Sequence, residues 1–399
     1  MSAASTLATS FGEWDDFIDK LRPIGSSALS LAWNPGDKQV RRELSRTLLT
    51  QLVHGYVGEM YADPDYPEFV STLGLLLNVA APVPDFMYQG TPIRGNGVYR
   101  ISGKRGTSLF VDISALAGYW PKGSPDQRRL GTYDLDDLEI TPKGEFDVVL
   151  SNERPPGYEG EWWHLDPRTQ RLNARRASYD WQNEVDARLT IERLDVPARR
   201  ARRSKEEIAR RMDELIDWIR TAALWWLTHL DKHKAAGLIN QLALQDYSGM
   251  GGPRGQVYLE GVYCLSPDEA LLIETDVPEI CRYWSFLVTD ELFTTLDWMH
   301  RFSSINGHQA RLDPDGRFRA VISAQDPGVP NWLDVGDYRT GLIQARWNNS
   351  SSAPVPKATT VKIGDVRKKF PNGTPLVTPD QRDKLLRQRR KGAQLRQVW

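Results

Sequence analysis

Titratable side chains are most densely spaced between Asp290 and Asp334, where aspartates, histidines and arginines lie within a few residues of one another. His300 and Arg301 are adjacent, and two serines follow them closely. One loop thus offers an acid or base, a holder of negative charge and small hydroxyls, which suits proton transfer with charge stabilisation. The alternative is a loop whose serine and asparagine side chains hydrogen-bond to its own backbone.

An enzyme built on these residues needs a proton carrier, a carboxylate that orients or abstracts, an arginine for negative charge, and flat side chains against the substrate. The candidate catalytic residues are His300, Asp326, Asp290, Arg301 and His164. The candidate substrate-binding residues are Trp332, Asn331, Trp284, Tyr283 and Arg346, with Arg346 also a candidate for holding negative charge. His164 is included because EWWHLD, at 161–166, joins two indoles, an imidazole and two carboxylates; the alternative is a strand edge with a merely hydrogen-bonded histidine.

His229 and His233 are four residues apart, the spacing at which a helix can offer two imidazoles to one zinc ion. The glutamate of the metalloprotease motif is missing, and the pair falls at the end of a charged helix. A solvated helix face is therefore the favoured interpretation, and no metal is expected.

No cofactor is expected either. The sequence has no P-loop and no nucleophile elbow, and the glycine run at 249–255 is not set between a strand and a helix. Nucleotide-dependent chemistry and serine hydrolase chemistry are thereby disfavoured. Cys264 and Cys281 form neither a zinc pair nor a disulfide framework and are expected to be buried thiols.

The charge balance is nearly neutral, with 51 Lys and Arg against 52 Asp and Glu in 399 residues. This balance argues against nucleic acid or a membrane surface as a partner. The first ten residues lack the pattern of a secretory signal, so we expect a soluble, cytoplasmic protein that acts on a small molecule. The basic residues from Arg382 to Arg396 are a candidate for contacts between subunits of a homo-oligomer.

The elements that must position these residues follow from periodicity. Helical spacing predicts helices at 11–22, 38–61 and 69–80. Ser204 and Glu207 form a capping box that should open a long helix reaching about Lys232. Strands are expected in two blocks, at 109–113, 146–150 and 185–191, and then at 257–265, 270–274, 282–289, 318–323, 341–347 and 359–363.

Two blocks of short strands separated by a long helix predict an α+β fold with jelly-roll-like antiparallel β-sandwich modules. The expected segments are an N-terminal helical region, a first β module, the central helix, a C-terminal jelly-roll-like module and a basic tail, at 1–81, 82–203, 204–246, 247–376 and 377–399. Within the C-terminal module, the stretch DPGVPNWLD at 326–334 is held rigid by its two prolines and offers Asn331 and Trp332 at the end of a sheet. The alternative is that Trp332 plugs the open end of the sandwich.

These C-terminal features resemble a known family. RYWS at 282–285, the strand at 318–323, DPGVPNWLD and the strand at 341–347 with its Arg346 are similar to the bacterial domain of unknown function 1214. The resemblance covers roughly 247–363 and implies a jelly-roll-like β domain, often preceded by a module called domain of unknown function 1254. It implies no reaction.

Three functions remain open. The first is an enzyme that acts on an apolar or polycyclic small molecule, or a glycoside of one, by nucleotide-independent acid-base chemistry as a lyase, hydrolase or isomerase. The second is a non-catalytic jelly-roll protein that binds a ligand or assembles. The third is a metalloenzyme, which metal analysis would test.

Overall fold

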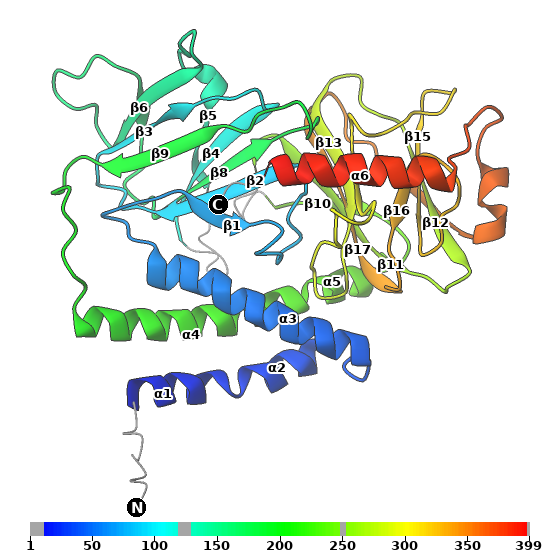
Figure 1. The fold of residues 1–399 in the computed structure, drawn as a ribbon, viewed down its shortest axis with the longest axis horizontal. Coiled ribbons are helices and arrows are strands. Elements are labelled where there is room, and N and C mark those ends of the chain that lie inside the picture. Colours follow the sequence, from blue (N-terminus) through cyan, green and yellow to red (C-terminus); the bar gives the residue numbers. More distant parts are fainter. Residues whose placement is uncertain (1–11, 119–128, 248–252, 397–399) are drawn as a thin grey trace, which may run out of the picture.

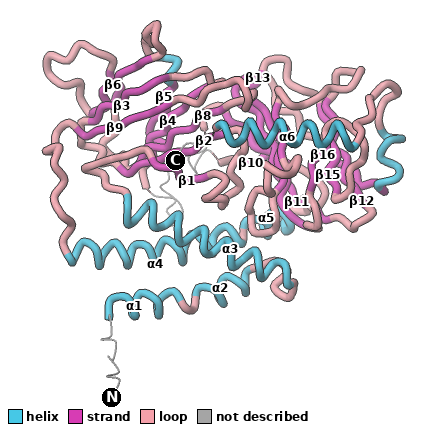
Figure 2. Tube along the Cα trace, viewed as in Figure 1, coloured by secondary structure: helices cyan, strands magenta, loops and turns pink. Residues whose placement is uncertain are grey.

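The computed structural model describes residues 12–118, 129–247 and 253–396. Its fold is α+β, as predicted: two sandwich-like β modules lie side by side, and helices cover one side of both (Figure 1). Figure 2 shows that the helices of the first sixty residues pack with the central helix as one layer beneath the sheets. No helix in the described ranges combines the length and apolar character needed to cross a membrane.

The N-terminal helices are held by an apolar stripe on the central helix. They are α1 (Gly12–Leu21), α2 (Ile24–Leu31) and α3 (Lys38–Gly55), the last continued by a π-helix, Tyr56–Tyr61. Asp37 caps α3 by accepting hydrogen bonds from two backbone N–H groups. Phe17 and Ile24 pack against Leu215 and Trp218 of the central helix in one buried cluster.

The prediction of a helix at 69–80 is wrong. The structure has a strand there, β1 (Val70–Leu73), followed by an irregular loop. The backbone of Ala80 and Ala81 has φ of 62° and 48°, which an α-helix cannot contain. Leu77 and Val79 are therefore buried from a loop and not from a helix face, while Leu76 is exposed.

The first β module consists of a five-stranded sheet, β1-β2-β8-β4-β5, and a four-stranded sheet, β7-β6-β3-β9, with a shared apolar core. Its remaining strands are β2 (Phe86–Pro92), β3 (Tyr99–Lys104), β4 (Phe110–Leu116), β5 (Arg129–Asp134), β6 (Glu145–Ser151), β7 (Trp162–His164), β8 (Arg171–Ala177) and β9 (Arg188–Arg193). The strand expected at 185–191 begins later than predicted because 185–187 form a loop that accepts hydrogen bonds from Thr107 and Ser108.

The central helix is two helices. Ser204 caps α4 (Lys205–Leu227) as predicted, by accepting a hydrogen bond from the backbone of Glu207. The helix ends at Thr228, and a short second helix, α5 (His229–Ala235), follows. This break turns α5 against the sheet of the second module, where it contacts β11.

The second β module repeats the first in outline, with a five-stranded sheet, β10-β11-β17-β13-β14, and a four-stranded sheet, β16-β15-β12-β18. Its strands are β10 (Ala243–Gln245), β11 (Gln256–Cys264), β12 (Glu269–Thr275), β13 (Cys281–Val288), β14 (Ser304–Asn306), β15 (Phe318–Ser323), β16 (Trp332–Asp334), β17 (Thr340–Ser350) and β18 (Lys357–Lys362). Strands β13 and β17 are almost wholly buried because one face lies on the sandwich core and the other packs against the first module, through Phe86 and Phe110.

The basic tail forms α6 (Pro379–Leu395), which lies across both β modules (Figure 1). Arg382, Arg389 and Arg396 recur every seven residues, so they share one face of this helix, and all three are buried. Arg382 pairs with Asp326 in the second module, and Arg396 pairs with Asp186 in the first. The seven-residue spacing thus ties the tail to its own chain, whereas contacts with a second subunit through this tail stay a prediction.

Candidate functional site

Asp290 lies in a tight turn directly after β13 and is 2% exposed. Its Oδ1 accepts hydrogen bonds of 2.9 Å from the backbone N–H groups of both Leu292 and Thr294. Its Oδ2 is buried and accepts no hydrogen bond from any residue that the structure describes. The turn therefore fixes the carboxylate through one oxygen and leaves the other without a hydrogen-bond partner among the described residues.

Burial raises the pKa of Asp290 from 3.8 to about 7. The backbone hydrogen bond from Thr294 and the nearby charge of Arg46 oppose this rise, but they do not cancel it. A carboxyl group that gains and loses its proton near neutral pH is suited to general acid-base catalysis.

Asp290 lines a pocket of about 400 Å³, hereafter the Asp290 pocket. Two other predicted catalytic residues, His300 and Arg301, line the same pocket. It is completed by Glu43 and Arg46 of α3, by Tyr338, and by the side chains of Leu75, Asn78, Thr294, Thr295, Leu296, Asp297 and Met299. Three of the predicted catalytic residues therefore line one pocket. Glu43 and Arg46 of α3, which line it too, were not predicted from the sequence.

The polar groups of the pocket are arranged in pairs. His300 Nδ1 lies 2.8 Å from Asp297 Oδ2, and both side chains are about half exposed. Arg46 lies 2.8 Å from Glu43, and Arg301 lies 3.2 Å from Asp334. Each of these basic side chains is therefore held near the pocket by a carboxylate, and the N–H groups that the pair does not use can bind a ligand.

The backbone beside the pocket is strained. Phe293 has φ of 61°, and the backbone N–H of Ala81, itself in the left-handed region, donates a 2.9 Å hydrogen bond to its carbonyl. Asn78 joins the same two segments through hydrogen bonds to the backbone of Thr295, of 2.7 Å and 3.1 Å. Strained residues held by their surroundings are concentrated at functional sites, so the geometry of this turn is a second reason to consider the pocket.

Asp326 and His164 lie elsewhere. Asp326 accepts a hydrogen bond from Gly328 in its own turn and pairs with Arg382 of α6 at 2.9 Å. His164 ends β7 in the first module, where its carbonyl accepts a hydrogen bond from Tyr133. The structure does not bring either residue to the Asp290 pocket.

The predicted substrate-binding residues are dispersed. Asn331 is buried and bridges backbone groups of Arg311 and Arg319, while Trp332 donates to the carbonyl of Ser323 and lies beneath Arg382. Trp284 belongs to the core of the second module. Tyr283 belongs to the core between the modules and donates a 2.7 Å hydrogen bond to the buried Asp85. Asn331 and Trp332 line one pocket of about 320 Å³ with Tyr179, Trp181 and Phe302, but Trp284, Tyr283 and Arg346 do not line it.

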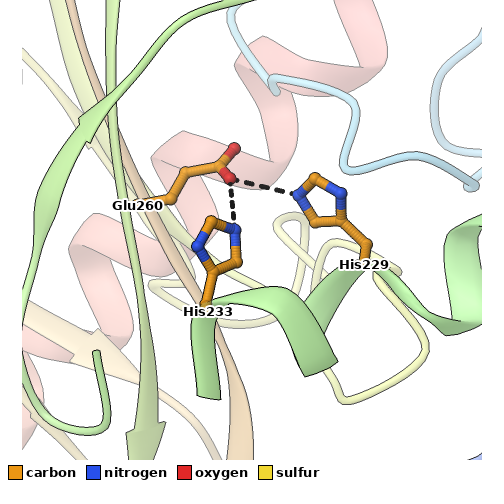
Figure 3. A group of neighbouring side chains, drawn as sticks. All are labelled: His229, His233 and Glu260. Carbon is orange, nitrogen blue, oxygen red and sulfur yellow. Dashed lines mark hydrogen bonds and ion pairs between the residues drawn. The ribbon is translucent and has the colours of Figure 1, made fainter. Parts of the chain in front are cut away.

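A second polar cluster is enclosed between α5 and β11. His229, His233 and Glu260 point toward one another there (Figure 3), and each is less than 5% exposed. The Nε2 atoms of His229 and His233 lie 3.1 Å and 2.8 Å from Glu260 Oε2. The interpretation of the histidines as a solvated face is therefore wrong, because the face of α5 that carries them packs on the sheet.

Further polar groups surround this cluster. The hydroxyl of Tyr247 donates a 2.5 Å hydrogen bond to Glu260 Oε2 and lies 3.3 Å from Nε2 of His229. Gln344 donates to Glu260 Oε1, and Arg346 donates to Gln344. Arg346 thus lies behind the histidine cluster, although it was expected beside a substrate.

The charge state of Glu260 follows from these contacts. Burial alone would raise its pKa, but hydrogen bonds from His229 and His233 outweigh burial and hold the pKa well below the usual range. Burial lowers the pKa of His229. A charged carboxylate beside a neutral imidazole is the state in which both residues can serve as metal ligands.

Comparison with known proteins finds a family match within the C-terminal module. Residues 267–346 match the model of a family described as protein of unknown function, DUF1214. This stretch, hereafter the DUF1214 region, is similar to that family. The resemblance predicted from the sequence is thereby confirmed, while a preceding module of the 1254 type stays a prediction. The DUF1214 match includes Asp290, His300, Arg301 and Arg346.

One solved structure supports the fold. A crystal structure of an uncharacterized protein from Burkholderia cenocepacia is 28% identical, with a TM-score of 0.82 over 89% of this chain and 98% of that chain. A Vibrio parahaemolyticus protein is 11% identical, with a TM-score of 0.44 over 86% of this chain and 99% of its own. No curated protein matches the sequence. The α+β fold is thus shared over nearly the whole chain with the first of these, beyond the DUF1214 region.

Proposed function

We propose that the protein is an enzyme that acts on a small molecule by acid-base chemistry in the Asp290 pocket, without a nucleotide. The observation that carries this proposal is a buried carboxylate with one oxygen free of hydrogen bonds from the described residues, at the wall of a pocket that also offers two arginines and a histidine. Sites that tune a titratable group by burial and surround it with charge are typical of proton-transfer enzymes.

Each group has a role that follows from its contacts. Asp290 acts as the base, because its Oδ1 is fixed by two backbone N–H groups and its Oδ2 is left for the substrate proton. Arg301 and Arg46 stabilise negative charge that develops on the substrate. His300, oriented by Asp297 at the exposed side of the pocket, returns a proton to the product. A lyase, hydrolase or isomerase reaction fits these roles.

The lining also limits the substrate. The pocket volume of about 400 Å³ lies within the range of small-molecule sites. Three apolar side chains, Leu75, Leu296 and Met299, share the lining with the charged groups. Because the tryptophans and tyrosines expected to hold a polycyclic substrate are packed elsewhere, we propose a smaller molecule with an anionic or carbonyl end and a short apolar part.

This proposal is tested by incubating the protein in D₂O with pooled small hydroxy acids, keto acids, esters and lactones. Mass spectrometry then detects deuterium incorporation or the gain or loss of water. We expect one compound class to react, and its turnover to fall roughly a hundredfold or more in Asp290→Asn, because general base catalysis contributes about that much.

The matched control is Asp326→Asn, which removes a carboxylate that lies outside the pocket and should leave turnover near that of the unchanged protein. The rate should also rise with pH through an inflection near 7, as Asp290 loses its proton. Turnover that survives Asp290→Asn unchanged would refute the proposal.

A groove in the helical layer favours a second candidate function, ligand binding without catalysis. It has a volume of about 800 Å³ and an apolar lining that includes Trp14, Val53, Tyr56 and Met212. Exposed apolar patches of this kind commonly bind ligands or proteins. If the pooled compounds bind without any turnover, and Tyr56→Ala abolishes this binding while Asp290→Asn does not, the binding function is preferred.

A further inference from the structure

We infer that His229, His233, Glu260 and Tyr247 form a binding site for one divalent first-row transition-metal ion of the zinc type. The ligand atoms are two imidazole Nε2 atoms, one carboxylate oxygen and one phenolic oxygen. Imidazole and carboxylate are ligands that zinc, iron and manganese accept in proteins. This site is separate from the Asp290 pocket, and the inference does not depend on the proposed function.

The spacing of the donor atoms supports a metal. Ligand atoms about 2.1 Å from a tetrahedral ion are roughly 3.4 Å from one another. Here Nε2 of His229 is 3.1 Å from Glu260 Oε2 and 3.3 Å from the hydroxyl of Tyr247, and Nε2 of His233 is 2.8 Å from the same carboxylate oxygen. To admit an ion at the centre, these three pairs of atoms would have to move apart by roughly 0.1–0.6 Å, and the hydroxyl of Tyr247, which is 2.5 Å from Glu260 Oε2, would have to move away from that oxygen by about 0.9 Å.

Hydrogen bonding alone explains the arrangement less well. Three groups, the two imidazoles and the phenol, converge on the single oxygen Oε2, while Oε1 receives Gln344. A carboxylate oxygen has two lone pairs, so a third donor on the same atom is poorly accommodated. A cation at that point would turn the crowded oxygen and both imidazoles into ligands of one centre.

The surroundings hold the ligands as metal sites require. Gln344 fixes the second oxygen of Glu260 and is itself held by Arg346, which resembles the outer hydrogen bonds that orient metal-binding carboxylates. The ring of Phe293 stacks on His229 with centroids 4.2 Å apart. The elements are also rigid, because the two histidines share one face of α5 and Glu260 lies in the middle of β11.

Four protein ligands leave no coordination position open, which is the pattern of a structural site. The ion would join α5 and β11 to the segment that carries Tyr247. Phe293 belongs to the Asp290 turn, so the same ion would also support the shape of that turn through His229.

The experiment uses the full-length protein, treated with dipicolinic acid to remove metal and checked by circular dichroism for retained structure. Zinc, manganese, cobalt and, under anaerobic conditions, ferrous chloride are then titrated separately by calorimetry, and bound metal is measured by mass spectrometry after gel filtration. We expect one equivalent of at least one of these ions per chain, and tetrahedral visible absorption bands with cobalt.

Variants then assign the ligands. His233→Ala and Glu260→Gln should abolish stoichiometric binding, and Tyr247→Phe, which keeps the ring in the fold, should weaken it at least tenfold. His300→Ala and His164→Ala, which remove histidines outside the cluster, should bind as the unchanged protein does. If a ligand variant fails to fold, the unchanged protein and Tyr247→Phe still decide the matter. No stoichiometric binding of any of the four ions, or binding unaffected by Tyr247→Phe and Glu260→Gln, would overturn the inference.

Discussion

The Asp290 pocket and the His229–His233–Glu260 cluster contain similar residue types in opposite states. In the cluster, the carboxylate of Glu260 receives four side-chain donors and lies wholly inside the fold. In the pocket, the carboxylate of Asp290 receives two backbone donors on one oxygen and none from the described residues on the other. Burial favours a raised pKa in both carboxyl groups, but the hydrogen bonds to Glu260 outweigh it and lower the pKa, whereas the pKa of Asp290 stays raised.

This difference separates a site that holds the fold together from one that can exchange a proton. Phe293 links the two, since its ring stacks on His229 and its backbone belongs to the Asp290 turn. Changes to the cluster should therefore alter stability most, and changes to the pocket should alter pH dependence and activity.

The largest effect is expected for Glu260→Leu. Removing the carboxylate leaves the donors of His229, His233 and Gln344 buried without their acceptor, which should cost about 3–5 kcal/mol of unfolding free energy. Urea denaturation followed by circular dichroism measures this loss. Asp268→Leu is the control, because both members of its pair with Lys362 are more than half exposed. A loss below about 1 kcal/mol would mean that the cluster does not hold α5 to the sheet.

The next effect concerns Asp290 and pH. The folded protein holds the carboxyl proton up to about pH 7, whereas the unfolded chain releases it near 3.8. The folded state thus binds more protons between these values, so stability should fall as pH rises from about 4 to 7, by about 4 kcal/mol at most. Asp290→Asn, which cannot ionise, should lose this decline.

Urea denaturation of both proteins at pH 5 and pH 8 measures the difference. Between pH 5 and pH 8, the unfolding free energy should fall in the unchanged protein and should fall by less in Asp290→Asn. Parallel pH dependence in the two proteins would contradict the raised pKa of Asp290.

A smaller effect is expected for Asn78→Ala, which removes two buried hydrogen bonds between the strained segments beside the pocket. The unfolding free energy should fall by about 1–3 kcal/mol, the cost of leaving the backbone groups of Thr295 unpaired. Hydrogen exchange of the amides at 290–295 should rise in the variant. Unchanged hydrogen exchange of these amides would show that the turn keeps its strained backbone conformation without Asn78.

The smallest effect on stability is expected for His300→Ala. The pair of His300 and Asp297 is about half exposed, so its loss should change the unfolding free energy by less than about 0.5 kcal/mol. Turnover should nonetheless fall if His300 returns a proton in the proposed reaction. A loss of unfolding free energy comparable to that of Glu260→Leu would mean that His300 stabilises the fold as the His229–His233–Glu260 cluster does.

Local features were predictable from the sequence. The N-cap at Ser204, most strands of the second module and the DUF1214 region follow from patterns a few residues long. Asp290, His300 and Arg301 meet at one pocket because they lie within one short connection between β13 and β14. Glu43 and Arg46 of α3 carried no signal that linked them to this loop, since nothing in a helical repeat shows which loop it will cover.

The sequence by itself determined that His229 and His233 share a helix face and that Arg382, Arg389 and Arg396 share another, because helical spacing fixes both. Only the tertiary structure decided that these faces are buried. The histidine face turns inward because α4 ends at Thr228 and α5 packs on β11, which supplies Glu260. The arginine face turns inward because carboxylates and carbonyl oxygens of both modules accept its hydrogen bonds. Burial of a charge depends on partners that lie far away in the sequence, and spacing along one helix contains no information about them.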